Sequence, residues 1–288
     1  MALDTPASQH EEPFVQPTEQ EWDQSLPSEA MSGVADGGSP GVTAVERALA
    51  VYEVFHRVRR PMSLTELARH ANIPKSSCHA IVKILAARGY LYQLQRPRAL
   101  YPTRRLFDLT REIHASDPLV ERVVPLLERL RESSEETVIL GKQQGEAVIY
   151  LHVLESHNPI RYSARPGEFK PLHSSAIGKA LLGNLKDAAL AASLTGLPLP
   201  RVTPHTLTDP QQLAVDIADG RRRGYFITRG ENVADVWAVS TTLALDGQVL
   251  AVAIAGPRHR MEEQLLRCAQ LLLATCGLIS RQWGAGPW

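Results

Sequence analysis

The sequence predicts an α+β chain in which an N-terminal winged helix-turn-helix is joined by a linker helix to a C-terminal mixed-sheet domain. Two observations predict this order. Apolar residues recur at helical spacing through the first part of the chain, and from Glu136 onward they alternate with a period of two, as in strands. The length of 288 residues is also enough for about two domains of ordinary size.

The charge of the chain is strongly segregated, although its formal net charge is zero. Residues 1–42 hold eight acidic side chains and no lysine or arginine, which gives −8. Residues 45–105 hold twelve basic and three acidic side chains, which gives +9, and the remainder has a charge of −1. A basic module beside a neutral one is typical of a nucleic-acid-binding domain attached to a second domain.

Residues 1–41 are expected to form a disordered acidic tail. This segment contains five prolines and many glutamine, glutamate, serine and glycine residues, with no apolar period that lasts two turns. Such a composition buries too little apolar surface to offset the entropy of ordering the chain. A role in shielding the basic module by mimicking DNA is a hypothesis that rests on the charge of the tail alone.

The helix-turn-helix is expected between Ser63 and Arg88. Ser63 and Glu66 have the spacing of a capping box, which begins a short helix, and Asn72 suits the turn. The second helix has one apolar stripe, formed by Cys78, Ile81, Val82 and Leu85. Its opposite face carries small polar and basic residues, which is typical of a helix that reads DNA. An ordinary helical hairpin is the alternative.

A helix over residues 45–58 precedes this motif and a hairpin follows it. Residues 90–94 alternate as a strand, residues 100–101 return as a second strand, and Arg96 and Arg98 lie in the turn between them. Three helices and a hairpin make a winged helix-turn-helix over residues 42–103. The wing arginines could reach phosphate or the minor groove, or they could belong to a solvated turn that is basic by chance.

The expected DNA contacts fall into two classes. Base edges would be read by small polar side chains and an imidazole on the second helix, namely Ser76, Ser77 and His79. Phosphates would be held by basic side chains of that helix and the wing, namely Lys75, Lys83, Arg88, Arg96 and Arg98.

Residues 104–117 are expected to form an amphipathic linker helix, and residues 118–288 a sheet domain. A helix over 119–130 has a broad apolar face that fits either a dimer contact or packing on a sheet. Strands are expected at residues 137–140, 147–153, 160–162, 225–228, 237–245 and 249–254. Further helices are expected at residues 187–194, 209–223 and 261–280, and after a loop that begins at Pro171.

The loop that runs into a helix after Pro171 is the best candidate for a small-molecule site. Ser174, Ser175 and Ala176 lie where the loop meets the helix. Free backbone N–H groups and the helix dipole at such a position favour a carboxylate. Ser174 could equally act as a simple helix cap, and the two roles are compatible.

The sequence contains little that points to catalysis, a metal or a membrane. It has no G-x-S-x-G, phosphate-loop or H-E-x-x-H motif. Cys78, Cys268 and Cys276 lack metal-binding spacing. His152, His157 and His173 could suggest a metal, but His152 and His157 would point to opposite faces of a strand and no carboxylate cluster completes a site. No apolar run reaches the roughly 18 residues of a membrane span. We therefore expect no metal, no cofactor, no catalysis and no membrane partner, and a cytoplasmic location.

With both halves considered, the chain resembles the IclR-type bacterial transcriptional regulators over roughly residues 42–281. The resemblance rests on SLTELARHANIPKSSCHAIVKILAARGYL and the wing, and on PLHSSAIGKALL, RRRGYFITRGE and LAVAIAGP in the second half. It implies a module that binds double-stranded operator DNA as a homodimer or a dimer of dimers. It also implies a GAF/PAS-like effector-binding domain that holds a small metabolite, often an organic or aromatic acid.

The resemblance also implies roles for particular residues. Asp235 and Trp237 would line the strand that faces the effector, and a large aromatic Trp237 would favour a ligand other than a small keto acid. Ala80 stands where relatives often have an arginine, so operator reading would depend more on the neighbouring polar residues. The expected function is thus a metabolite-responsive transcriptional regulator. A metabolite-binding enzyme with an accessory helix-turn-helix is the alternative.

Overall fold

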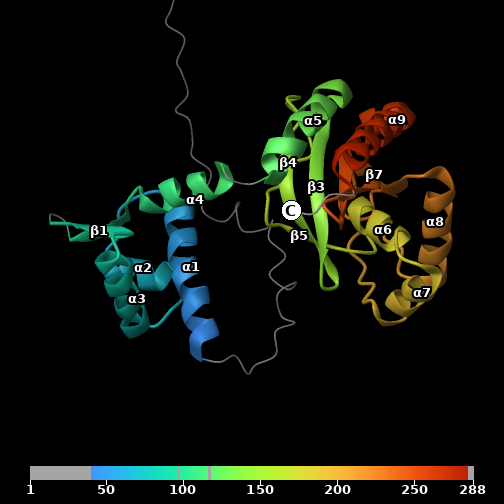
Figure 1. Ribbon diagram of the computed structural model, residues 1–288. Helices are drawn as coiled ribbons and strands as arrows, with labels where there is room; N and C mark the ends of the chain where they lie inside the picture. The colour runs from blue at the N-terminus through green and yellow to red at the C-terminus, as the bar shows by residue number, and fades with distance from the viewer. Residues whose placement is uncertain (1–39, 96–97, 116–117, 285–288) are drawn as a thin grey trace, which may run out of the picture. The chain divides into compact units, whose positions relative to one another are not determined.

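The computed structural model of the protein describes residues 40–95, 98–115 and 118–284. The chain divides between Thr110 and Arg111 into two compact units, both seen in Figure 1. Nearly all of the expected acidic tail lies outside the described residues, and so does Arg96 at the wing tip. No helix within the described ranges is long and apolar enough to cross a membrane.

Three helices and a hairpin make up the N-terminal unit, which confirms the winged helix-turn-helix. The helices are α1 (Pro40–Val58), α2 (Leu64–His70) and α3 (Lys75–Ala87). The two antiparallel strands are β1 (Leu91–Leu94) and β2 (Ala99–Pro102). Helix α4 (Arg105–Ala115) follows the hairpin.

Helix α2 begins with the expected capping box. Ser63 Oγ accepts a hydrogen bond from the Glu66 N–H at 3.2 Å, and Glu66 Oε2 accepts one from the Ser63 N–H at 2.8 Å. Asn72 has a φ of 51°, the left-handed conformation that turns the chain towards α3. Apolar side chains from all three helices and the hairpin then form one core, which includes Val51, Phe55, Leu67, Cys78, Val82, Leu91 and Leu100. The opposite face of α3 is therefore left to solvent.

A six-stranded sheet forms the centre of the C-terminal unit. Its strands lie in the order β5-β4-β3-β8-β7-β6, and every described pairing is antiparallel. The strands are β3 (Thr137–Gln144), β4 (Ala147–Leu154), β5 (Phe169–Pro171), β6 (Phe226–Arg229), β7 (Val236–Leu245) and β8 (Gln248–Pro257). The sheet that we expected to be mixed is thus antiparallel, because hairpins and short connections join most of its strands.

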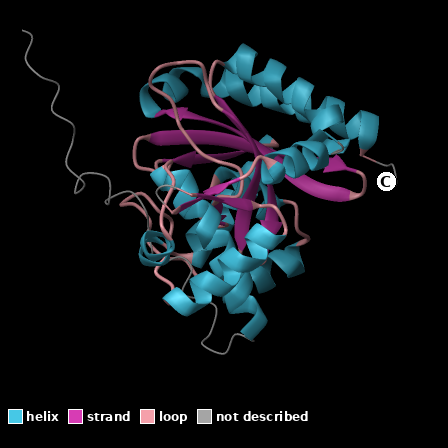
Figure 2. Cartoon of the chain, turned by 90° about the vertical axis from the view of Figure 1, so that its left-hand side faces the viewer, coloured by secondary structure: helices cyan, strands magenta, loops and turns pink. Residues whose placement is uncertain are grey.

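Helices cover both faces of this sheet (Figures 1 and 2). One face packs on α5 (Pro118–Ser134) and α9 (Arg258–Trp283). The other packs on α6 (Ala176–Gly183) and α8 (Pro210–Arg223), and α7 (Asp187–Gly196) packs beside α8 in the same core. Strand alternation divides β8 between the two cores. Val252 and Ile254 point to the α9 face, whereas Ala251, Ala253 and Ala255 point to the α6 face. Small side chains therefore leave room beneath α6.

The strand expected at residues 160–162 is wrong, because this segment is irregular. Side chains, rather than a neighbouring strand, bond its carbonyl groups. Thr137 Oγ1 donates to the carbonyl oxygen of Tyr162 at 2.6 Å, and Arg260 Nη2 donates to that of Ile160 at 2.8 Å. The sheet instead ends with the short strand β5, which pairs with β4 and which we had not expected.

The capping box predicts how the N-terminal unit responds to acid. Hydrogen bonds from Ser63, and then the contact with Arg60, lower the pKa of Glu66 from 4.5 to about 2. Because the folded-state pKa lies below the unfolded one, ionised Glu66 stabilises the fold above pH 4.5, and this contribution is lost as the pH falls towards 2. Glu66→Gln retains an acceptor for the Ser63 N–H but does not titrate. Its melting temperature, followed by circular dichroism, should therefore fall less than that of the wild type between these pH values. An identical acid response of the two proteins would contradict this assignment.

Candidate functional site

Helix α3 presents polar and basic side chains on the surface of the N-terminal unit. Lys75, Ser76, His79 and Lys83 are exposed, as is Arg88 at the C-cap of the helix. A groove runs between α3, the start of α2 and the wing. The groove is lined from α3 by Lys75, His79 and Lys83, and from the wing by Arg98. The structure thus brings four of the expected DNA contacts to one surface.

Ser77 lies at the edge of this surface and is tied to α1. It is half-buried, and its Oγ accepts a hydrogen bond from Arg47 Nη1 at 3.2 Å. Arg47 thereby brings a further guanidinium to the first turns of α3. Helical periodicity could not reveal this contact because the two residues are 30 positions apart in the chain. Ala80 is exposed on the same helix and offers no hydrogen-bonding group.

A narrow pocket lies between the sheet and the N-terminus of α6, with about 390 Å³ of empty space when its open mouth and the gaps between its lining atoms are counted. Three alanines of β7 and β8 face it from the sheet: Ala238, Ala253 and Ala255. The other lining residues are Ile139, Tyr150, Tyr162, Ser175, Ala176, Ile177, Thr228, Asn232, Val233 and Val236. The pocket is mostly apolar with a few polar groups, as is usual for small-molecule sites.

Two of the expected residues, Ser175 and Ala176, line the pocket. Ser175 is the N-cap of α6: its Oγ accepts a hydrogen bond from the Gly178 N–H at 3.1 Å and donates one to the carbonyl oxygen of Pro171 at 2.8 Å. The hydroxyl of Ser175 is therefore used within the protein. What this turn can offer a ligand is the backbone N–H groups of Ala176 and Ile177, which have no partner inside a helix.

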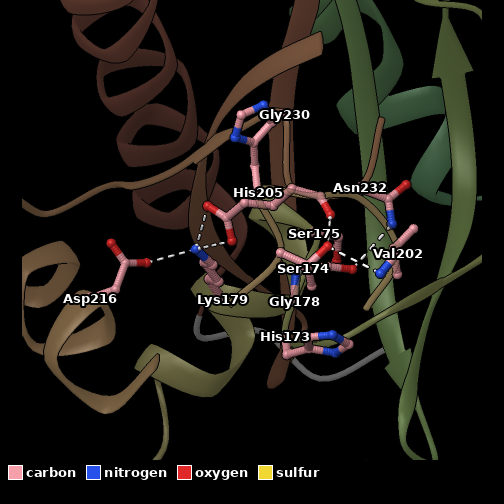
Figure 3. Close-up of polar contacts among 12 residues, drawn as sticks. His173, Ser174, Ser175, Gly178, Lys179, Val202, His205, Asp216, Gly230 and Asn232 are labelled. Atoms are coloured by element: carbon pink, nitrogen blue, oxygen red, sulfur yellow. Dashed lines mark hydrogen bonds and ion pairs between the residues drawn. The ribbon is translucent and has the colours of Figure 1, made fainter. Parts of the chain in front are cut away.

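Ser174, which we considered as the helix cap, has a different contact. It is fully buried, and its Oγ accepts a hydrogen bond from Asn232 Nδ2 at 3.2 Å (Figure 3). Asn232 belongs to the loop between β6 and β7 and itself lines the pocket. This hydrogen bond therefore connects the loop at the pocket to the segment that leads into α6.

Asp235 and Trp237 are not brought to the pocket. Asp235 is exposed, and Trp237 packs on the α5 and α9 face, where the Arg229 guanidinium lies 5.4 Å from its ring centroid. Side chains alternate along β7, so Val236 and Ala238 face the pocket while Trp237 points away. The pocket position expected for Trp237 is therefore wrong.

The aromatic side chains of the pocket are Tyr150 and Tyr162, which the sequence analysis missed. Burial, followed by the influence of Tyr162, raises the pKa of Tyr150 well above its ordinary value, so this phenol stays protonated and can donate a hydrogen bond. The signal for Tyr150 was present in the alternation of residues 147–153. That alternation separates two faces but does not say which of them is hollow.

Helix α6 also carries a buried charge cluster. Lys179 is fully buried, and its Nζ lies 2.8 Å from Asp216 Oδ2 on α8 (Figure 3). The same Nζ lies 2.6 Å from Glu231 Oε2 in the β6–β7 loop. Burial raises the pKa of Glu231, and the ammonium of Lys179 opposes that shift. With all three groups ionised, the cluster has one positive and two negative charges. Sequence patterns gave no sign of it, because its members come from three separate segments.

The histidines considered for a metal do not form a site. Burial lowers the pKa of His173, whose Nε2 lies 3.0 Å from the carbonyl oxygen of Pro200, so its ring is neutral. Among the described residues, no group of three histidine, cysteine, aspartate or glutamate side chains is arranged to hold a metal ion.

Comparison with known proteins gives matches in both units. The family model described as the IclR helix-turn-helix domain matches residues 44–95, and the one described as bacterial transcriptional regulator IclR C-terminal matches residues 112–281. The regulator BhcR of Paracoccus denitrificans is 34% identical over 236 residues, which cover 81% of this chain and 84% of that protein. The repressor AllR of Escherichia coli K12 is 27% identical over 248 residues, which cover 85% and 91%.

Solved structures show the same fold. The IclR structure of Thermotoga maritima has a TM-score of 0.72 at 22% identity, covering 84% of this chain and 99% of that one. An IclR homologue from Microbacterium hydrocarbonoxydans, solved in complex with 4-hydroxybenzoate, has a TM-score of 0.66 at 24% identity, covering 83% and 98%. The two matching family models span both the winged helix-turn-helix and the sheet domain, and so the chain belongs to the IclR family of bacterial transcriptional regulators.

Proposed function

We propose that this regulator binds a specific operator and that a small organic or aromatic acid, held in the pocket at α6, controls that binding. The observation that carries the proposal is that pocket, with the first backbone N–H groups of α6 at one end and a mostly apolar lining elsewhere. In this proposal residues 42–103 bind DNA, residues 104–117 are the linker and residues 118–288 bind the effector. The curated relatives reported above are named as regulators or repressors, so they give no support to the enzymatic alternative.

The proposed DNA contacts follow from the exposed face of α3 and the wing. Basic side chains would bind phosphate and set the position of the helix, namely Lys75, Lys83, Arg88, Arg96 and Arg98. The polar side chains between them would read base edges, namely Ser76, Ser77 and His79. Arg47 would support this surface by holding Ser77.

The proposed effector contacts follow from the start of α6. The backbone N–H groups of Ala176 and Ile177 would bind a carboxylate, and Ser175 would hold that turn in place as its cap. Ser174 would act through Asn232, to which it is hydrogen-bonded. The homologue solved with 4-hydroxybenzoate supports an aromatic acid as one class of ligand to test.

We also propose that two copies act together, as a dimer or a dimer of dimers, in the cytoplasm. Helix-turn-helix proteins commonly bind two half-sites one or more helical turns apart. Leu109 and Ile113 of α4 are exposed, which fits a contact between copies in this helix. The effector must bind the DNA-competent and DNA-incompetent arrangements with different affinity, since equal affinity would shift nothing.

Lys83→Ala should weaken binding to operator and to unrelated DNA by a similar factor. Lys83 is exposed and lines the groove, so it is expected to neutralise one phosphate. Its loss should reduce the slope of log K against log salt by about one. Fluorescence anisotropy at several salt concentrations measures this slope.

Lys142→Ala is the matched control, because Lys142 is an exposed lysine on β3 of the C-terminal unit. Its Nζ donates a hydrogen bond to Gln248 Oε1 within that same unit. This variant should leave the slope unchanged. If the Lys83 variant kept the wild-type slope, or lost affinity for the operator only, Lys83 would not be a phosphate contact.

Some organic or aromatic acids should raise the melting temperature of the full chain and also change its retardation of its own promoter fragment. A ligand that binds only the folded state stabilises it by RT ln(1 + [L]/Kd). Ala255→Leu, which fills part of the pocket, should abolish the shift. Ala192→Leu on the exposed side of α7 should preserve it. Consumption of the acid, or a shift that survives in the Ala255 variant, would argue against the proposal.

A further inference from the structure

The pocket offers hydrogen-bond donors but no ionised side chain of positive charge. Its polar lining consists of Ser175, Thr228, Asn232 and the two tyrosines, and neither lysine nor arginine is among the residues that line it. An anion in this pocket therefore meets neutral donors and the dipole of α6. Such groups stabilise one negative charge but do not neutralise it.

Two lysines near the pocket, Lys179 and Lys170, are already paired with carboxylates, and the Nζ of Lys170 lies 5.8 Å from the ring centroid of the lining residue Tyr150. Lys179 of α6 contacts both Asp216 and Glu231 at 2.6–2.8 Å. Lys170 of β5 lies 3.0 Å from Glu168. To recruit either ammonium, a ligand would have to displace a carboxylate that is in place before the ligand arrives. For Lys179 that exchange would also leave a buried carboxylate without a partner, which is costly.

The Lys179 cluster adds negative rather than positive potential next to the pocket. One ammonium faces two carboxylates, so its net charge is −1 when all three groups are ionised. Glu231 directly precedes Asn232, which lines the pocket, and Lys179 follows Ala176 by less than one helical turn. In a partly buried site with a low effective dielectric, a net negative charge beside the pocket repels a second anion more than it would in water.

The sheet side of the pocket has no cation to neutralise a second carboxylate, because the polar side chains that line it there, Tyr150 and Thr228, are uncharged. Ala238, Ala253 and Ala255 present only methyl groups there. An ionised carboxylate that loses its water against such a surface, with no cation to pair with, is strongly disfavoured. A carboxylate at the α6 end differs, since it meets the N–H groups of Ala176 and Ile177.

We propose that the pocket selects monoanions, namely monocarboxylates with an uncharged and largely apolar body, and rejects acids that carry a second negative charge. The inference rests on the proposed function, because it names the charge class of the effector. Polar but uncharged substituents are compatible with it, since Tyr150, Tyr162 and Thr228 can hydrogen-bond them.

Pairs of related compounds that differ by one negative charge test the proposal. Calorimetric titration of the full chain at neutral pH would compare benzoate with benzene-1,3-dicarboxylate, butanoate with butanedioate, and benzoate with benzamide. At least one monocarboxylate should bind, about tenfold or more tightly than its dicarboxylate partner, and benzamide should bind more weakly than benzoate. A dicarboxylate or benzamide that binds as tightly as the matched monocarboxylate would overturn the charge limit.

The same titrations separate this inference from the proposed function. If a dicarboxylate binds as tightly as its monocarboxylate partner and changes operator retardation, the charge limit is wrong while effector control stands. If none of these acids binds, both the charge limit and the acid-binding pocket are overturned.

Asp216→Asn tests the contribution of the cluster, because it changes the net charge from −1 to zero without altering a lining residue. The ratio of the affinity for each monocarboxylate to that for its dicarboxylate partner should fall several-fold in this variant. Asp219→Asn is the control: it removes the same charge from α8 at a residue that pairs with Arg222 on the surface. If the affinity ratio stays at its wild-type value in the Asp216 variant, or falls equally in the Asp216 and Asp219 variants, the cluster does not contribute to charge selection. If the Asp216 variant folds poorly, the titrations of the wild-type protein still test the charge limit.

Discussion

The size of the side chains on the two faces of β8 is the constraint on which the C-terminal unit depends. Large residues, including Val252 and Ile254, fill the core beneath α5 and α9. On the other face Ala251, Ala253 and Ala255 leave part of the space beneath α6 open. Because strand alternation assigns successive residues to opposite faces, one strand can stabilise a close-packed core and border a pocket at once.

The position of α6 then follows from close packing and from a buried charge. A side chain at Gly178 would place its Cβ 2.1 Å from the carbonyl oxygen of Leu172, so only glycine lets the helix lie against the loop before it. Lys179 must keep its carboxylate partners, because a buried ammonium without them is strongly destabilising. These partners lie on α8 and beside Asn232. A ligand that shifts the start of α6 would therefore act on the β6–β7 loop and on α8 together.

Local sequence patterns predicted the helices and hairpin of the N-terminal unit well. The features of the C-terminal unit that were predicted wrongly depend on contacts between residues far apart in the sequence. The capping box of Ser63 and the apolar stripe of α3 depend on residues three or four positions apart, so both could be read from the chain. Residues 160–162 alternate like a strand, yet they are bonded by Thr137, 25 positions away from Tyr162, and by Arg260, 100 positions away from Ile160. The expected position of Trp237 in the pocket was wrong for a related reason. Alternation along β7 separates two faces but does not say which one borders a cavity.

The distribution of charge suggests where affinity and specificity for DNA would come from. Affinity for DNA would come largely from lysine and arginine at phosphate, which is strong but indifferent to sequence. Ala80 offers no hydrogen-bonding group on the exposed face of α3, so base reading would depend on side chains that are small or weakly discriminating. A DNA-binding domain of this kind gains specificity when two copies must bind two half-sites at a fixed spacing. Control through that spacing would then be more effective than control of any single side chain, because a change of spacing removes one half-site's contacts all at once.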